Sequence, residues 1–514
     1  MNYLDIDQIV NQLYLSGYGH PRVRTPFGLK YIINADSTAS GAPNRVIESI
    51  IANQVLPYYS NTHSNAYCGR LMSHLIEQSK EIIRKSVKAR RCDQIIFTGN
   101  GCSGAINHLI HCLNLKIHTP NQTVVFISRA EHHSNHLPWT HLPITLVYIP
   151  LLENGLIDIQ HLKRELDRYS SYKTIIASFI ATSNVTGVHQ KVDSISQLIH
   201  QYKGLIFWDY AASAPYIPIN IHKNDQLGQY FDAIFISPHK FFGGPGTPGI
   251  LIANQNLFQN NIPYCPAGGT VRFVCPAFKT YAPNIETKET GGTPNVIGCI
   301  KVGLVFDLKS RYQQLISVRE LELVKNVQNR LLKITNLRLL NPINNLIRQP
   351  IFVFMIDSLH YNYVVVLLND LFGIQTRGGV SCCSLLAQDI LQIGPDQQNH
   401  IYKQIVDDKG VPSNYGWCRV SFHYSMPDFI VEYIIRSIEL TAQYGYLFKK
   451  YYKYHPTKNN WLYNSLTSQM PFDDFGPIKL SLDQYTQSYA PTYLDMKILN
   501  DQLQNAISAI KLAK

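Results

Sequence analysis

The sequence predicts an α/β protein with a mostly parallel sheet in a large domain, followed by a smaller α+β domain. Between about residues 93 and 253, short apolar runs alternate with helix-like segments. The runs are apolar almost throughout, as expected of strands that are buried on both faces of a sheet. After about residue 305, one long helical stretch and then shorter mixed elements indicate a second domain.

Seven apolar runs are the candidate strands of this sheet. They are Gln94–Thr98, Thr123–Ser128, Thr145–Pro150, Thr174–Ile180, Leu205–Asp209, Ala233–Ser237 and Gly249–Ala253. Helix-like segments between several of them cover Gly104–Leu115, Ile159–Arg168 and Ser194–Tyr202. Strands that alternate with helices form mostly parallel sheets, and ligands bind at the carboxyl ends of such strands.

The change of pattern along the chain predicts four segments. We expect an N-terminal segment over residues 1–40, a large domain over 41–304, a small domain over 305–445 and a C-terminal extension over 446–514. The small domain opens with the helical stretch Lys309–Ile334. The extension is rich in Tyr, Asn and Lys and regains helical periodicity only over Tyr493–Lys514, so its sequence indicates no role.

The composition restricts the class of protein. The acidic start lacks a secretory signal, and the apolar stretches are too short to span a membrane. The ten cysteines form no CxxC pair and have no metal-ligand spacing, which predicts reduced thiols, no metal site and a cytoplasmic location. The net charge of +11 is spread along the chain, and the densest basic run, Phe448–His455, favours a solvated face over a nucleic-acid surface.

Polar clusters follow five of the predicted strands, at the edge where a ligand is expected. They comprise Thr98–Gly104, Glu131-His132-His133, Ser183-Asn184, Asp209, and Ser237 with His239 and Lys240. Five clusters at five strand ends are a stronger indication of a site than any one of them.

Lys240 lies directly after a buried strand and before four small or rigid residues, Gly243–Gly246. At the mouth of a core, partial desolvation favours the neutral, nucleophilic amine that a Schiff base requires. The alternative is one solvated lysine among many in a basic protein.

The remaining strand ends supply groups that suit an anionic, aromatic ligand. The glycine-rich turn Gly99–Ser103 precedes a helix, where backbone N–H groups bind anions, although a plain loop is an equal alternative. Asp209 needs a partner to stay ionised, and a protonated ring nitrogen, an arginine or a helix cap would each serve. His132 could stack on an aromatic cofactor or move protons, and the alternative is a structural role.

These motifs resemble the class V aminotransferase and cysteine desulfurase family, which includes selenocysteine-lyase-like enzymes. The resemblance extends from about Tyr31 to about Ile434 and implies the PLP-dependent transferase fold (aspartate-aminotransferase-like, fold type I), with pyridoxal 5′-phosphate (PLP) as cofactor. The matching segments are Thr98–Asn107, Glu131–Trp139, Ser183–Gly187, Asp209–Ala214, Ser237–Gly249 and Gly291–Asn295.

The resemblance also implies a role for each strand-end residue. Lys240 would form the Schiff base with PLP and then move protons. Asp209 would bond the pyridine nitrogen, His132 would stack on the ring, and Asn184 would lie near the ring hydroxyl. The phosphate would be held by Gly101, Cys102, Ser103, Ser237 and His239.

Two further residues carry implications for assembly and substrate. Thr293 would reach the phosphate of a neighbouring subunit, which implies a homodimer with shared sites. Arg419 would bind the carboxylate of an amino-acid substrate, a task that suits a planar guanidinium. The sequence departs from the family pattern at Ala212, where a glutamine is common, and in a phosphate turn that is one residue longer.

The reaction subtype depends on Cys382, five residues after Arg377. The resemblance implies a cysteine desulfurase, in which a cysteine thiolate takes sulfur from L-cysteine and leaves alanine and an enzyme persulfide for a sulfur-acceptor protein. Arg377 would favour the thiolate. The adjacent Cys383 is either a spectator or a second carrier. Alternatives are a class V aminotransferase, epimerase or lyase acting on another amino acid, and a non-catalytic binding protein.

Overall fold

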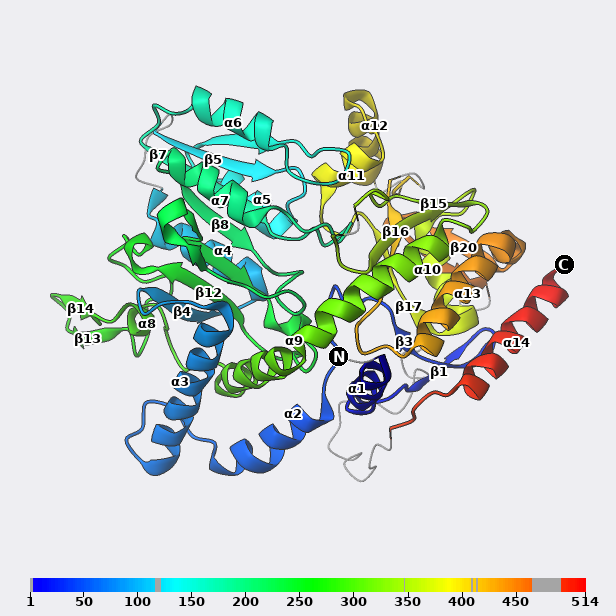
Figure 1. The fold of residues 1–514 in the computed structure, drawn as a ribbon, viewed down its shortest axis with the longest axis horizontal. Helices are drawn as coiled ribbons and strands as arrows, with labels where there is room; N and C mark the ends of the chain where they lie inside the picture. The colour runs from blue at the N-terminus through cyan, green and yellow to red at the C-terminus, as the bar shows by residue number, and fades with distance from the viewer. Residues whose placement is uncertain (1–2, 116–121, 346, 408–409, 413–414, 465–490) are drawn as a thin grey trace. The chain divides into compact units, whose positions relative to one another are not determined.

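A computed structural model describes residues 3–115, 122–345, 347–407, 410–412, 415–464 and 491–514 (Figure 1). The chain forms two compact units. The large unit comprises Thr38–Val318 and Ile347–Gln349, and the small unit comprises Met1–Ser37, Arg319–Leu346 and Pro350–Lys514. Among the described residues, no helix is both long and apolar enough to cross a membrane.

A seven-stranded sheet forms the centre of the large unit, in the order β4-β12-β11-β8-β7-β5-β6. Only β12 runs against the other six strands, because it pairs antiparallel with both β4 and β11. The strands are β4 (Asp93–Thr98), β5 (Thr123–Ser128), β6 (Thr145–Ile149), β7 (Thr174–Ile180), β8 (Leu205–Asp209), β11 (Ala233–Ile236) and β12 (Gly249–Asn254). All seven predicted strands are therefore confirmed, each to within one residue at either end.

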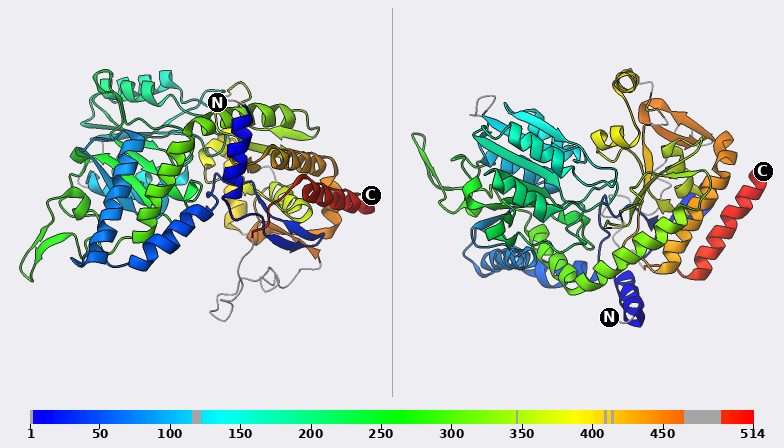
Figure 2. Two further views of the ribbon diagram at one scale, coloured as in Figure 1. Left: turned by 60° about the horizontal axis from the view of Figure 1, so that its bottom comes forward. Right: turned by 45° about the horizontal axis from the view of Figure 1, so that its top comes forward.

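Both faces of this sheet are buried, as the continuous apolar runs predict. Neighbouring residues of one strand enter different cores: Ile95 belongs to one cluster and Ile96 to another, as Phe126 and Val125 do. Side chains of a strand alternate between the two faces, so a strand between two helical layers has to be apolar throughout. Figure 2 shows these helical layers on the sheet.

The helices of the large unit are α2 (Arg45–Ile50), α3 (Tyr67–Val87), α4 (Gly101–Cys112), α5 (His133–Thr140), α6 (Ile159–Arg168), α7 (Val192–Gln201) and α8 (Ile285–Lys288). The three predicted helices correspond to α4, α6 and α7, although their first residues do not all agree, and the other four were not predicted. Short strands complete the unit: β9 (His222–Asn224), β10 (Gln229–Tyr230), β13 (Val271–Val274) and β14 (Lys279–Tyr281).

Two predicted helix starts in the large unit are wrong by three residues or more, and glycine lies near both. Helix α4 begins at Gly101, three residues before the predicted start at Gly104, and α9 (Val296–Leu331) begins well before Lys309. Glycine disfavours helix interiors, so its presence at these positions weakens the helical signal in the sequence. Gly303 lies in α9 because a Cβ there would come within 2.8 Å of Ser79 Oγ, so close packing requires glycine.

The small unit is built around a four-stranded sheet in the order β15-β16-β19-β18. Its strands are β15 (Leu337–Leu339), β16 (Ile351–Ile356), β18 (Arg377–Gly379) and β19 (Trp417–Ser421). Its helices are α1 (Tyr3–Leu15), α10 (Tyr361–Phe372), α11 (Ser384–Ile390), α12 (Pro395–Val406), α13 (Asp428–Tyr444) and α14 (Met496–Ala513). Further short strands are β1 (Arg22–Thr25), β2 (Gly28–Tyr31), β3 (Ile33–Asn34), β17 (Ile374–Gln375), β20 (Tyr452–His455) and β21 (Asn460–Tyr463).

The two ends of the chain are part of this unit's core. Leu499, Ala506 and Ile510 of α14 are buried in one apolar cluster with residues of α10 and α13. The side chain of Gln502 donates hydrogen bonds to the carbonyl of Phe372 and the hydroxyl of Tyr433. Residues 496–513 therefore stabilise the small unit.

Candidate active site

The sheet of the large unit brings the predicted cofactor residues to one edge. Because β4, β7, β8 and β11 run in the same direction, their carboxyl ends lie at this edge. Asp209 is the last residue of β8, and Lys240 ends the short 3-10 helix Pro238–Lys240 that follows β11. Strands β8 and β11 are neighbours, which places these two residues on adjacent strand ends.

Asp209 and Lys240 form the charged centre of this edge. The Asp209 side chain is 1% exposed, and its Oδ1 accepts a hydrogen bond of 2.8 Å from the N–H of Ala211. Burial raises the pKa of this carboxyl group, and the positive charge of Lys240 partly offsets the effect. The Asp209 carboxylate is therefore deeply buried beside one cation, Lys240, and a second cation nearby would stabilise its ionised form further.

Gly101, Ser237 and His239 form a tight cradle at the start of α4. Gly101 has a φ of +56°, and a Cβ there would lie 2.8 Å from Ser237 Oγ and 2.9 Å from the His239 ring. The Ser237 hydroxyl accepts a hydrogen bond of 2.9 Å from the N–H of Cys102. Asn100 precedes the helix without capping it through its side chain, so this end of α4 suits an anion.

The histidine of the cradle is held neutral. Burial and the neighbouring positive charge of Lys240 lower the pKa of His239 to about 4. A neutral imidazole retains one N–H donor and one acceptor, so His239 contributes a hydrogen bond and no charge of its own.

His132 is fixed at the N-terminus of α5 by its own helix. The N–H of Ser134 donates to His132 Nδ1 at 3.1 Å, which puts the ring proton of the neutral form on Nε2. The hydroxyl of Ser134 lies 3.0 Å from the same nitrogen and 2.6 Å from the hydroxyl of Ser103. Ser134 therefore connects two predicted site residues that belong to different strand ends.

A buried network beneath His132 was not predicted from the sequence. Burial raises the pKa of Glu131 to about 8, although Ser128 and Asn135 both donate hydrogen bonds to its carboxyl group. Asn135 in turn accepts a hydrogen bond of 2.6 Å from Ser178 on β7. Glu131 was the sequence signal for this network, because a buried glutamate at the end of a strand requires hydrogen-bond partners.

The two other predicted residues of the large unit differ in environment. Asn184 is 5% exposed and lies in the turn that follows β7. Thr293 is exposed, and its hydroxyl accepts a hydrogen bond of 3.4 Å from Asn61. Thr293 is therefore available at the surface of the large unit.

The small unit holds the other three predicted residues. Arg377 on β18 lies opposite Arg419 on β19 in the antiparallel register, so both side chains leave the same face of the sheet. Nη2 of Arg377 donates to the sulfur of Cys382 at 3.5 Å. Arg419 is almost fully buried and forms an ion pair of 2.5 Å with Asp36, a residue that the sequence analysis did not single out.

The two adjacent cysteines differ in access and backbone conformation. Cys382 is partly exposed and has a φ of +57°, directly after Ser381 with a φ of +55°. Two successive residues in the left-handed region are strained, and the indole N–H of Trp417 donates to the Ser381 hydroxyl at 3.2 Å within this turn. Cys383, in contrast, is fully buried at the start of α11.

The profile of the class V aminotransferase family matches residues 32–432, which is most of the chain. The chain belongs to this family. Its members are PLP-dependent enzymes, so this is a PLP-dependent enzyme of fold type I.

Relatives with curated names agree with this assignment. The chain is 30% identical over 362 residues to a probable cysteine desulfurase from Halalkalibacterium halodurans, covering 69% of this chain and 85% of the relative. It is 25% identical over 368 residues to a probable cysteine desulfurase from Streptomyces coelicolor, covering 69% of this chain and 84% of the relative.

Solved structures share the fold. A cysteine desulfurase from Thermococcus onnurineus superposes with a TM-score of 0.67 at 23% identity, covering 80% of this chain and 95% of that one. One from Escherichia coli superposes with a TM-score of 0.65 at 20% identity, covering 84% and 97%.

Proposed function

We propose that this enzyme is a cysteine desulfurase that converts L-cysteine to L-alanine and leaves the sulfur as a persulfide on Cys382. The observation that carries this proposal is the contact between Arg377 Nη2 and the sulfur of Cys382, on a partly exposed, strained turn. The contact holds the Cys382 sulfur on a turn where it is partly exposed, in a position to act as the nucleophile that sulfur transfer requires.

The residues of the large unit fit PLP on two counts. The cradle around Gly101 has no space for a Cβ and presents the start of α4, as a phosphate requires. The buried Asp209 carboxylate suits a protonated ring nitrogen. When bound, PLP supplies an electron sink for bond cleavage at the amino acid.

The protein's own residues have separate tasks in this proposal. Lys240 would hold the cofactor and move protons, and Asp209 would pair with the ring nitrogen. His132, with its ring proton on Nε2, would contact the ring, and Asn184 would bind near the ring hydroxyl. Gly101, Cys102, Ser103, Ser237 and His239 would hold the phosphate.

The sulfur transfer itself balances without an added reductant. The Cys382 thiolate bonds to the sulfur of L-cysteine, whose carbon–sulfur bond breaks, and the former cysteine carbon takes a proton to give alanine. Arg419 binds the substrate carboxylate, in competition with Asp36. Cys383 is a spectator in this reaction because it is fully buried.

We further propose a homodimer in which Thr293 reaches the partner's phosphate. Thr293 is exposed, and the hairpin of β13 and β14 exposes three large apolar side chains, those of Phe273, Val274 and Phe278. A sulfur-acceptor protein would take the persulfide sulfur. All ten cysteines are free thiols, which fits the reducing conditions of a cytoplasmic location.

An assay of L-cysteine turnover tests the proposal. We expect one alanine for each sulfide released in the presence of a thiol reductant, and a loss of about 10²-fold or more in sulfide release for Cys382→Ser. Cys383→Ala is the matched control and should retain turnover. Equal activity of wild type and Cys382→Ser would contradict the nucleophile, and conversion of 2-oxo acids in place of sulfide release would indicate an aminotransferase.

A further inference from the structure

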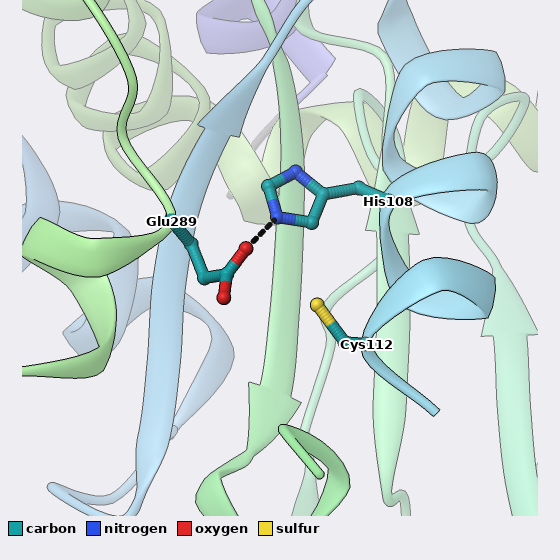
Figure 3. A group of neighbouring side chains, drawn as sticks. All are labelled: His108, Cys112 and Glu289. Atoms are coloured by element: carbon teal, nitrogen blue, oxygen red, sulfur yellow. Dashed lines mark hydrogen bonds and ion pairs between the residues drawn. The ribbon is translucent and has the colours of Figure 1, made fainter. Parts of the chain in front are cut away.

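Three buried side chains at the far end of α4 bring together a set of metal-ligating atoms. His108 and Cys112 lie one turn apart on α4, and Glu289 follows α8 (Figure 3). Their ligand atoms all lie within 4.8 Å of one another, and the side chains point toward a common space. The sequence gives no metal-ligand spacing here, because Glu289 is 181 residues from His108.

The spacing of the three ligand atoms can be compared with that of a tetrahedral site. His108 Nε2 lies 2.9 Å from Glu289 Oε2. Metal–ligand bonds of about 2.0–2.3 Å at tetrahedral angles separate neighbouring ligand atoms by about 3.3–3.8 Å. A metal ion would therefore need a small opening of the His108–Glu289 contact, and the Cys112 sulfur already lies within 4.8 Å of both other ligand atoms.

The groups around the cluster orient its ligands. The N–H of Tyr264 donates to Glu289 Oε2 at 3.0 Å, and the Tyr264 ring stacks on His108 with centroids 4.6 Å apart. Such outer contacts hold ligands in place at metal sites. Tyr264 is itself 45% exposed, so the cluster lies beneath a residue that faces solvent.

The second carboxylate oxygen of Glu289 is not fully satisfied. Among the described residues, Oε1 accepts no hydrogen bond, although Lys288 Nζ lies 3.3 Å away as an ion-pair partner. The Glu289 side chain is 1% exposed, so this oxygen has lost its water. A buried carboxylate in this condition is available to a cation.

We propose that His108, Cys112 and Glu289 bind a zinc-type divalent transition metal, with water in the fourth position. One imidazole, one thiolate and one carboxylate are the ligand types that Zn²⁺ takes, whereas calcium and magnesium take oxygen alone. The Cys112 thiol loses its proton to solvent as the sulfur–metal bond forms. The charges of thiolate and carboxylate then equal that of the ion, and the Lys288 ammonium group keeps its hydrogen bond of 2.8 Å to the carbonyl of Asn260.

The position of the site suggests what the ion does. Helix α4 begins at the cradle of Gly101 and Cys102 and ends at Cys112, while Glu289 precedes Thr293 by four residues. The metal joins the last turn of α4 to the segment that leads to Thr293. It therefore stabilises both segments without contacting the reacting atoms.

Cobalt tests the site in the full-length, PLP-loaded enzyme. After chelation and reduction, wild type should bind about one Co²⁺ per chain and show the ligand-field bands of tetrahedral cobalt with a thiolate ligand. Zn²⁺ should displace the cobalt and raise the midpoint of thermal unfolding. Cys112→Ala should lose the bands and the thermal shift, whereas Cys299→Ala, at another fully buried cysteine, should retain both.

Two measurements keep the test decisive if Cys112→Ala fails to fold. Cys112→Ser preserves the volume, and Glu289→Gln removes the carboxylate charge; each should lower Co²⁺ affinity at least tenfold while circular dichroism reports a native fold. Two results would overturn the proposal and leave a buried His108–Glu289 ion pair. One is a wild type that binds no Co²⁺, and the other is a cobalt–thiolate spectrum that persists in Cys112→Ala and Cys112→Ser.

Discussion

The two units hold their proposed functional residues by different means. In the large unit, Asp209 and Lys240 follow directly from the ends of parallel strands, and the sheet fixes their positions. In the small unit, Cys382 lies on a turn of two left-handed residues, and a single guanidinium contact at 3.5 Å orients its sulfur. The proposed cofactor residues depend on the scaffold, whereas the proposed nucleophile depends on a strained local conformation.

This difference suggests a division of labour. A rigid strand edge suits a cofactor that must stay bound through every reaction cycle. A strained turn suits a thiol that first has to reach the substrate and then present its sulfur to an acceptor. Variants that damage one group of residues and spare the other test whether the two are independent.

The largest effect is expected for Lys240→Ala. Loss of the amine removes both the attachment of PLP and a proton carrier, so turnover should fall by about 10²–10⁴-fold or more. The yellow colour of the purified protein should change at the same time. Lys223→Ala, at an exposed lysine of the same unit, should behave as wild type.

The same variant separates the two units. Alkylation of Cys382, followed by peptide mass spectrometry, should proceed at the wild-type rate in Lys240→Ala because Arg377 is unchanged. A slower alkylation would show that the reactivity of Cys382 depends on the cofactor residues, and the division proposed above would then be wrong.

An intermediate effect is expected for Gly101→Ala. A left-handed alanine costs about 1–2 kcal/mol, and its Cβ would also meet Ser237 and His239. The dissociation constant of PLP, measured by absorbance titration of the stripped enzyme, should therefore rise at least about tenfold. Gly99→Ala is the matched control, because no atom lies within 4 Å of a Cβ at that position. Equal PLP affinity in the two variants would rule out the cradle.

The sequence predicted the strands and the residues at their ends because both depend on local pattern. Seven apolar runs identified the strands, and a parallel sheet then brings their carboxyl ends together. The first residue of α4 was missed because glycine at position 101 argues against helix, although it is the residue that the left-handed start requires.

Contacts between distant segments had no such local signal. The partner of Arg419 is Asp36, 383 residues away, and neither residue shows this pairing in its own neighbourhood. The cluster of His108, Cys112 and Glu289 has no local signal either, because its third member lies 177 or more residues from the two on α4. The sequence could identify Arg419 as a candidate for binding a substrate carboxylate, but it could not reveal that Arg419 already forms an ion pair with Asp36.

The smallest and most informative effect is expected for Asp36→Asn. Asp36 competes with the substrate carboxylate for the buried guanidinium of Arg419, so its neutralisation should lower KM for L-cysteine by about 3–10-fold. The kcat should stay close to wild type, since Arg377 and Cys382 are untouched. Because the buried guanidinium of Arg419 loses its ion pair with Asp36, the midpoint of thermal unfolding should fall, and an added carboxylate ligand should restore it.

Asp357→Asn, at an exposed acid of the same unit, controls for the change in net charge. A higher KM in Asp36→Asn would mean that Asp36 positions Arg419 for the substrate, and the small unit would then rely on a fixed scaffold as the large unit does.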